Sequence, residues 1–203
     1  MNDTLPRLLR SNAAKYGAGK VALREKELGV WQPYSWSDYF EHVHYFTLGL
    51  VSLGLAKGDT ISIIGDNRPE WLFAELSAQS AGAIGIGLYQ DAILKEVSYI
   101  INLAESKFIV AEDQEQVDKV LDMGDELTTV KYIVYTDPRG MRKYEDSRLI
   151  SFPAVEDLGR EYEQAHPGAY DALVDATAAE DPAHTRYRSL QNGPTTGAAQ
   201  TAA

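Results

Sequence analysis

The residues best suited to chemistry form the short run Asn67-Arg68-Pro69-Glu70-Trp71, which directly follows a predicted strand at residues 60–64. That strand is apolar and β-branched, as in strands buried on both faces of a parallel sheet. Asn67 and Glu70 have the spacing of a capping box and Pro69 suits a first turn, so a helix is predicted to begin here. Its amino end could attract an anion at the carboxyl edge of the sheet. Helix capping explains the same residues equally well, and both interpretations stay open.

A glycine pair in the next predicted strand, residues 84–88, resembles the start of a dinucleotide-binding fingerprint. Gly85 and Gly87 are spaced as its first two glycines, but Gln90 stands where the third should be, and the run lies inside a strand. Glycines within a strand let another backbone or a ligand come close. Close packing against the sheet is the favoured interpretation.

The four histidines are outside any familiar catalytic or metal-binding pattern. His42 and His44 are two residues apart on a predicted helix, so they point in different directions and are not expected to form a metal pair. His166 and His184 have neither partner ligands nor a nucleophile motif nearby. We therefore assign no catalytic residue and no metal ligand, and the absence of cysteine removes thiol chemistry.

The elements that must position these residues alternate regularly along the chain. Short β-branched runs are separated by helical patterns, which predicts an α/β fold with a doubly wound, mostly parallel sheet. A hairpin with its turn at residues 27–29 precedes it. Ser35 with Asp38, and Asp113 with Gln116, have the spacing of helix caps. Strands are predicted at 60–64, 84–88, 108–111, 132–135 and 149–152, and helices at 4–17, 35–54, 67–82, 93–104, 113–121, 153–166 and, more weakly, 170–179.

Composition limits the kinds of partner. The chain has 203 residues, 44% of them hydrophobic, which is enough for one α/β domain with a sizeable core. A net charge of −11 would repel a phosphate backbone, so nucleic acid is not expected as a partner. The sequence lacks both the apolar core of a signal peptide and an apolar run of the roughly 20 residues that a membrane span needs. We expect a soluble, cytoplasmic chain.

The chain changes character at residue 183. Beyond this point Tyr187 and Leu190 are the only large apolar residues, and acidic residues stop. Such a segment buries too little surface to offset the entropy of ordering it, so a disordered tail is predicted. The resulting domain organisation is an α/β domain at residues 1–182 and a tail at 183–203.

Five short segments carry a family resemblance: residues 24–26, 31–36, 65–71, 87–91 and 111–118. Through them the sequence resembles the N-terminal part of AMP-forming, adenylate-forming acyl-CoA synthetases, in particular bacterial long-chain fatty-acid–CoA ligases. This similarity covers residues 4–182 and implies a partial AMP-binding N-terminal domain. Members of the family couple a fatty acid to ATP, release pyrophosphate, and pass the acyl group to coenzyme A. The resemblance therefore implies ATP, Mg²⁺ and CoA as cofactors, fatty acid as substrate, and a cytoplasmic or membrane-peripheral location.

The family's phosphate loop reads Thr-Ser-Gly-Thr-Thr-Gly-x-Pro-Lys and follows an Asp-aliphatic strand. Here Asp181-Pro182 matches, but the apolar strand and the lysine are missing, and Thr195, Thr196 and Gly197 are at most a remnant of the loop. A chain without that loop, the adenine pocket and the mobile C-terminal lid is expected to be inactive alone. We expect it to expose apolar surface and to self-associate.

Two other functions stay open: a non-catalytic α/β module that pairs with a separate chain, and a small nucleotide-binding domain. The abrupt change at residue 183 also favours a tail read in an altered frame over a functional tail.

Overall fold

The computed structural model describes residues 4–190 and 193–201, and for residues 186–190 and 193–199 it gives the backbone alone. Its frame is a seven-stranded sheet in the order β7-β6-β5-β3-β4-β8-β9, parallel except for the β8–β9 pair. The predicted doubly wound, mostly parallel α/β sheet is confirmed. The strands of this sheet are β3 (Thr60–Ile64), β4 (Ile84–Leu88), β5 (Phe108–Ala111), β6 (Tyr132–Tyr135), β7 (Leu149–Ser151), β8 (Pro182–Leu190) and β9 (Gly193–Thr201).

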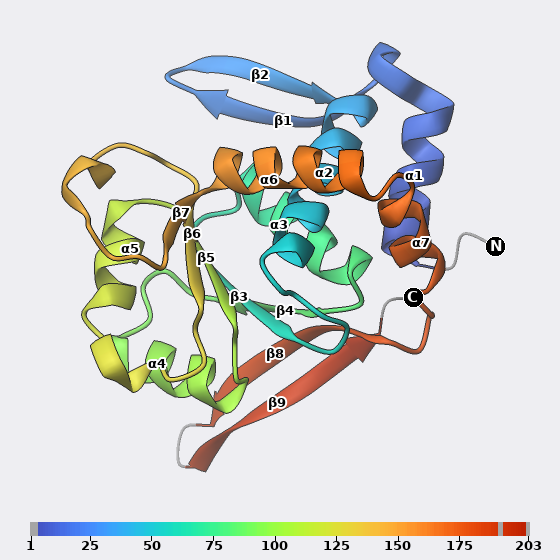
Figure 1. Cartoon of the computed structure of the whole chain (residues 1–203). Coiled ribbons are helices and arrows are strands. Elements are labelled where there is room, and N and C mark those ends of the chain that lie inside the picture. The colour runs from blue at the N-terminus through green and yellow to red at the C-terminus, as the bar shows by residue number, and fades with distance from the viewer. Residues whose placement is uncertain (1–3, 191–192, 202–203) are drawn as a thin grey trace.

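Helices cover both faces of the sheet (Figure 1). α2, α3 and α6 lie on one face, and α4 and α5 lie on the other. Within the described ranges no helix is long and apolar enough to cross a membrane. The helices are α1 (Leu5–Tyr16), α2 (Trp36–Ser52), α3 (Pro69–Ser80), α4 (Leu94–Leu103), α5 (Gln114–Leu121), α6 (Phe152–Ala165) and α7 (Ala169–Asp175), with 3₁₀ turns at Gly17–Gly19, Gly124–Glu126 and Met141–Lys143.

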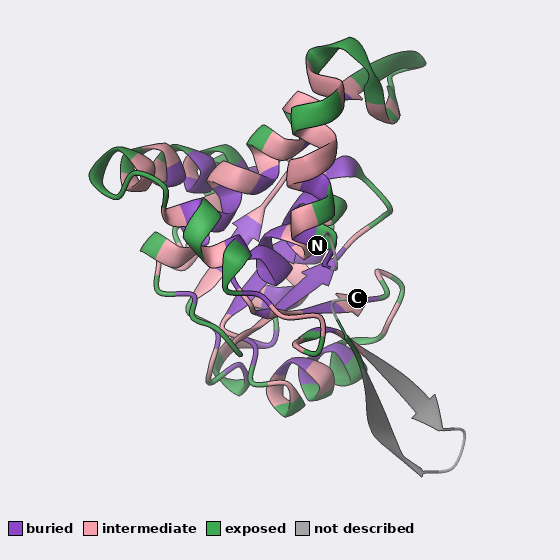
Figure 2. Cartoon of the chain, turned by 90° about the vertical axis from the view of Figure 1, so that its right-hand side faces the viewer, coloured by how far each residue is buried: buried purple, intermediate pink, exposed green. Residues whose placement is uncertain are grey.

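The central strands are buried on both faces, which explains their continuous apolar sequences (Figure 2). Successive side chains point to opposite faces, so one strand contributes to two cores. Ile61 and Ile63 of β3 pack with α2, α3 and α6, whereas Ile64 packs with α4 and α5.

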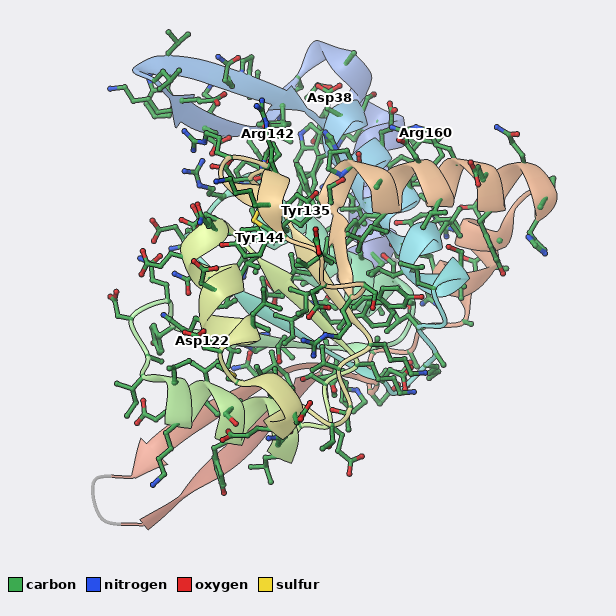
Figure 3. All side chains as sticks on the ribbon, turned by 60° about the vertical axis from the view of Figure 1, so that its left-hand side comes forward. Asp38, Asp122, Tyr135, Arg142, Tyr144 and Arg160 are labelled. Atoms are coloured by element: carbon green, nitrogen blue, oxygen red, sulfur yellow. The ribbon has the colours of Figure 1, made fainter. Side chains whose placement is uncertain are left out.

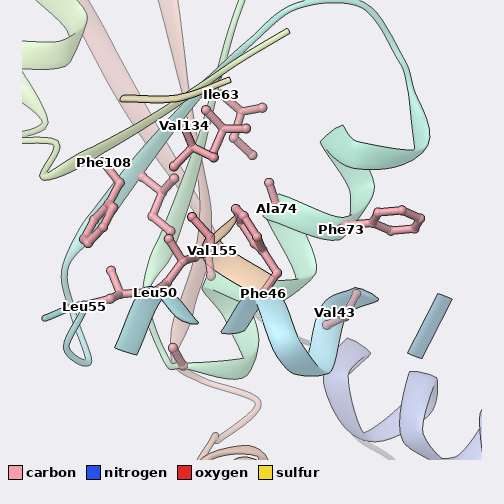
Figure 4. Packing of buried hydrophobic residues seen from close by; sticks show 14 of the residues in the cluster. Val43, Phe46, Leu50, Leu55, Ile63, Phe73, Ala74, Phe108, Val134 and Val155 are labelled. Carbon is pink, nitrogen blue, oxygen red and sulfur yellow. The ribbon is translucent and has the colours of Figure 1, made fainter. Parts of the chain in front are cut away.

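Helices α2 and α6 approach each other unusually closely. A Cβ added to Gly49 would lie 1.9 Å from the carbonyl oxygen of Val155, and one added to Gly159 would lie 1.9 Å from that of Tyr45. At the same contact the rings of Phe46 and Phe152 stack with centroids 3.9 Å apart. Figure 4 shows Phe46 beside Val155 in this core. Only glycine permits this separation, because any side chain would overlap the facing backbone.

A hairpin of β1 (Val21–Glu27) and β2 (Val30–Ser35) stands away from the sheet at the top of Figure 1. Its turn falls at Leu28-Gly29, as predicted, with φ of 46° and 85°. The predicted capping box then starts α2: Asp38 N donates to Ser35 Oγ at 3.1 Å, and Ser35 N donates to Asp38 Oδ2 at 2.8 Å.

The segment between β6 and β7, residues 136–148, folds back onto α5. Tyr144 donates its hydroxyl proton to Asp118 Oδ1, and Gln114 Nε2 donates to the Tyr144 oxygen at 2.9 Å. Figure 3 shows Tyr144 on the α5 side of the molecule. These bonds hold an otherwise irregular segment beside the carboxyl edge of the sheet.

The structure differs from the disordered tail predicted from residue 183. β8 and β9 form an antiparallel pair, and β8 joins β4 where His184 lies opposite Gly85. Strand pairing satisfies backbone N–H and C=O groups without large apolar side chains, so composition alone did not reveal these strands. The altered reading frame and the domain boundary at residue 182 stay predictions.

Candidate functional site

The connections after β3 and β4 leave the sheet on opposite faces. The chain after β3 continues through α3, and the chain after the neighbouring β4 continues through α4, so their loops diverge at the carboxyl ends of the two strands. In open α/β sheets, ligands bind in crevices at such a point. A cleft of about 620 Å³ lies here and is our candidate functional site.

The cleft is walled by both loops and by the helices that follow them. Trp71 and Glu75 of α3 form one wall, and α4 forms another. Gly87 lets the indole of Trp71 lie against β4, since an added Cβ would be 3.0 Å from Trp71 Cζ2. This is the close packing that was favoured over a dinucleotide fingerprint. The remaining lining residues are Gly65, Asp66, Asn67, Leu88, Tyr89, Gln90, Asp91, Ala92, Glu96, Val97, Ile100, His184 and Gln200.

Hydrogen bonds tie the two loops together at the cleft. Gln90 Nε2 donates to Asp66 Oδ1 at 2.9 Å, and Asp66 N donates to Glu112 Oε2 at 2.5 Å. Lys119 of α5 also donates to the carbonyl oxygen of Gln90. The loop after β3 is therefore held by the loops after both neighbouring strands.

Arg68 is the cation nearest to the start of α3, and two carboxylates already hold it. Its Nε donates to Glu112 Oε1 at 2.5 Å and its Nη1 to Glu25 Oε1 at 2.8 Å. The hydrogen bond to Glu112, opposed by partial burial and supported by Glu25, raises the pKa of the Arg68 guanidinium. Because its charge is compensated, Arg68 gives an anion little attraction at this helix end.

The predicted capping box at Asn67 and Glu70 is wrong. α3 begins at Pro69, its N-cap is Arg68, and no side chain caps it. Glu70 is therefore the second helical residue, one position too early to reach back as the glutamate of a capping box does. Burial raises the pKa of its carboxyl group. Pro69 does occupy the first turn, as predicted.

The cleft has an acidic lining. Asp66, Glu75, Asp91 and Glu96 contribute carboxylates, and His184 Nδ1 lies 3.2 Å from Glu75 Oε1 without the geometry of a hydrogen bond. This contact was not found from the sequence, because His184 and Glu75 come together only when β8 adds to the sheet beside β4. Such a lining favours ligands that donate hydrogen bonds and disfavours phosphate or carboxylate groups.

His42 and His44 have separate partners. His42 Nδ1 lies 2.6 Å from Glu156 Oε1, and its ring stacks on Phe73; His44 Nε2 lies 3.1 Å from Glu163 Oε2. Both carboxylates belong to α6, so the two rings help to join α2 to α6. This agrees with the expectation that His42 and His44 point in different directions.

The phosphate-loop remnant lies in a strand. Thr195, Thr196 and Gly197 belong to β9, with Thr196 opposite Arg188 and Gly197 opposite Tyr187. Their side chains are outside the part of the chain that the structure describes. A contact between these residues and a phosphate stays a prediction.

Comparison with known proteins identifies the family. The model of the family described as "AMP-binding enzyme" matches residues 9–187. "Long-chain-fatty-acid--CoA ligase ACSBG2" of Xenopus laevis is 31% identical over 131 residues, which are 64% of this chain and 18% of that protein. "Long-chain-fatty-acid--CoA ligase ACSBG1" of Rattus norvegicus is 28% identical over 162 residues, 79% of this chain and 22% of that protein.

A solved structure with a similar fold is that of the anthranilate CoA ligase AuaEII in complex with anthranoyl-AMP. It gives a TM-score of 0.78 with 17% sequence identity, and the match covers 98% of this chain and 34% of that one. This likeness concerns the fold.

The chain belongs to the AMP-binding enzyme family, as the resemblance implied. Its relatives include long-chain fatty-acid–CoA ligases, and it spans about a fifth of the length of those it matches. The particular resemblance to bacterial long-chain ligases stays a prediction.

Proposed function

We propose that this chain supplies the first sheet layer of an ATP-dependent long-chain fatty-acid–CoA ligase. The family match over residues 9–187, with long-chain ligases as relatives, carries the proposal. The reaction would join a fatty acid to ATP with release of pyrophosphate, and then transfer the acyl group to the thiol of CoA. ATP, Mg²⁺ and CoA would be its cofactors.

We also propose that the 203 residues do not catalyse this reaction alone. Adenylate formation needs cations and N–H donors around the phosphates, whose charge grows in the transition state. Beside the cleft, Arg68 is paired with Glu112 and Glu25, and the cleft lining itself is acidic. The residues present therefore do not fit a triphosphate, and we derive no catalytic step from this cleft.

A second candidate is a non-catalytic module that pairs with another chain. An apolar groove of about 240 Å³ between α1, α2 and α3 favours it. Leu5, Leu8 and Leu72 line the groove and are each more than a third exposed. Apolar side chains exposed in a groove of this kind are more stable against a partner chain or a second copy than against water.

Palmitate-dependent exchange of labelled pyrophosphate into ATP tests the proposal that the 203 residues are inactive alone. The chain alone should give no exchange above a protein-free blank. Exchange that required palmitate and disappeared in Trp71→Ala, but not in Leu103→Ala outside the cleft, would show that the chain is active. That result would contradict the proposal that it is inactive alone. Sedimentation equilibrium tests whether a second copy occupies the groove, because a chain that stays monomeric at high concentration does not self-associate there.

A further inference from the structure

The tip of the β1–β2 hairpin carries a residue that the turn itself does not favour. Leu28 and Gly29 both have positive φ, and two-residue turns of this shape prefer Asn followed by Gly. Leu28 is also 93% exposed, so a large apolar side chain points into water. Backbone conformation and solvation would both be better served by asparagine, so stability of the hairpin does not explain leucine at this position.

The hairpin has two chemically different faces. Residues paired across an antiparallel ribbon share a face, and adjacent residues alternate between faces. Glu25 lies on the inner face and pairs with Arg68 of the body. Arg24 and Lys26 lie on the outer face, and Lys26 pairs with Trp31, which is 60% exposed, with its Nζ 5.9 Å from the indole centroid.

The outer face carries positive charge in an acidic chain. In the parts of the chain that the structure describes, Arg24 makes no ion pair, and Lys26 has only its contact with the Trp31 ring. The net charge of the whole chain is −11. Glu27, next to the tip, is two positions from Glu25 and so lies on the inner face. Two cations without an ion-pair partner beside an exposed indole therefore attract anions to the outer face.

We infer that the tip and outer face of this hairpin, formed by Arg24, Lys26, Leu28 and Trp31, bind the surface of an anionic lipid bilayer. Leu28 would enter the boundary between headgroups and acyl chains, where Trp31 also partitions well. Arg24 and Lys26 would meet the lipid phosphates. The inference is independent of the proposed ligase reaction, because vesicle binding is measured without turnover.

A bilayer fits this surface better than a protein partner does. A stable protein interface needs about 800 Å² on each side, whereas four residues on a projecting ribbon offer a small convex patch. A bilayer accepts such a wedge because its headgroups move aside. Acidic groups on the body are screened beyond a Debye length of about 10 Å at 0.1 M salt.

Co-sedimentation with lipid vesicles tests the inference. We expect the 203-residue chain to bind phosphatidylcholine vesicles containing 30% phosphatidylserine more tightly than vesicles of phosphatidylcholine alone. Each cation near the surface contributes about fivefold, so Arg24→Gln with Lys26→Gln should weaken binding about 25-fold. The matched control, Lys95→Gln with Lys131→Gln, removes the same charge from α4 and from the residue before β6 and should change binding less than about twofold.

Leu28→Asn separates membrane contact from a structural role. Asparagine suits the positive φ, so the melting temperature should rise slightly while vesicle binding falls. A rise in melting temperature with unchanged vesicle binding would overturn the role of Leu28. Equal binding to neutral and anionic vesicles, or equal losses in the outer-face variant and its control, would overturn the inference. So would a dimer that Leu28→Asn dissociates, since the occupant would then be a second copy.

Discussion

The contact between α2 and α6 and the cleft between β3 and β4 both pair carboxylates with cations, yet they are held in different ways. At the helix contact, Phe46 and Val155 are fully buried, and two glycines bring the backbones together. Beside the cleft, Arg68 joins Glu112, in the loop after β5, to Glu25 of β1, and its own side chain is 43% exposed. Packing fixes the first region and charge fixes the second, so the two should respond differently to mutation, salt and pH.

The largest expected effect is at the helix contact. Phe46→Ala removes a buried ring stacked on Phe152 and should lower the free energy of unfolding by about 3–5 kcal/mol. Leu103→Ala, on an exposed part of α4, is the control and should stay within about 1 kcal/mol. Urea unfolding followed by circular dichroism measures both. Equal losses would mean that this contact is not the packed centre of the fold.

Gly159→Ala tests the close approach directly. Its new Cβ would lie 1.9 Å from the Tyr45 carbonyl oxygen, so α2 and α6 must separate. We expect a loss of about 1–3 kcal/mol in the free energy of unfolding. Gly19→Ala, which has open space around the added carbon and no positive φ, should be nearly neutral. An unchanged free energy of unfolding for Gly159→Ala would show that the two helices lie farther apart than in this structure.

The same contrast explains what the sequence could predict. Buried strands and amphipathic helices leave a period in the sequence, so the parallel sheet, the hairpin turn and the caps at Ser35 and Asp113 were predictable. The cleft is built from loops, which have no period. Glu112 reaches Arg68 only because β5 lies beside β3, and strand order is not written in any local pattern. Paired strands with small side chains, such as β9, also escape a search for apolar runs.

A smaller effect is expected at the cleft. Glu112→Gln weakens its bonds to Arg68 and Asp66, but Arg68 is partly exposed, so the loss in unfolding free energy should be about 0.2–1 kcal/mol. The difference from wild type should shrink in 1 M salt, because exposed charges are screened. Gly159→Ala is the contrast, since its loss should hardly change with salt. A loss above 3 kcal/mol for Glu112→Gln would place this network among the buried ones.

The smallest effect concerns pH at the helix contact. Burial lowers the pKa of His42, but the hydrogen bond and charge of Glu156 outweigh burial and leave the pKa above its usual value near 6.5. A raised folded-state pKa stabilises the protein fully below pH 6.5, and this contribution is lost as pH rises through the folded pKa. Thermal melts of wild type and His42→Gln should therefore differ most in acid and converge in alkali. His166→Gln is the exposed control, and a gap between wild type and His42→Gln that widened with pH would contradict the sign.

The central claim is that the chain is one layer of an AMP-binding ligase whose own cleft does not hold a triphosphate. Calorimetric titration with MgATP tests it most directly. We predict no saturable heat up to millimolar nucleotide, because Arg68 is already paired and carboxylates line the cleft. Saturable binding that Trp71→Ala abolishes and Leu103→Ala preserves would contradict it, because the nucleotide would then occupy this cleft without the rest of the enzyme.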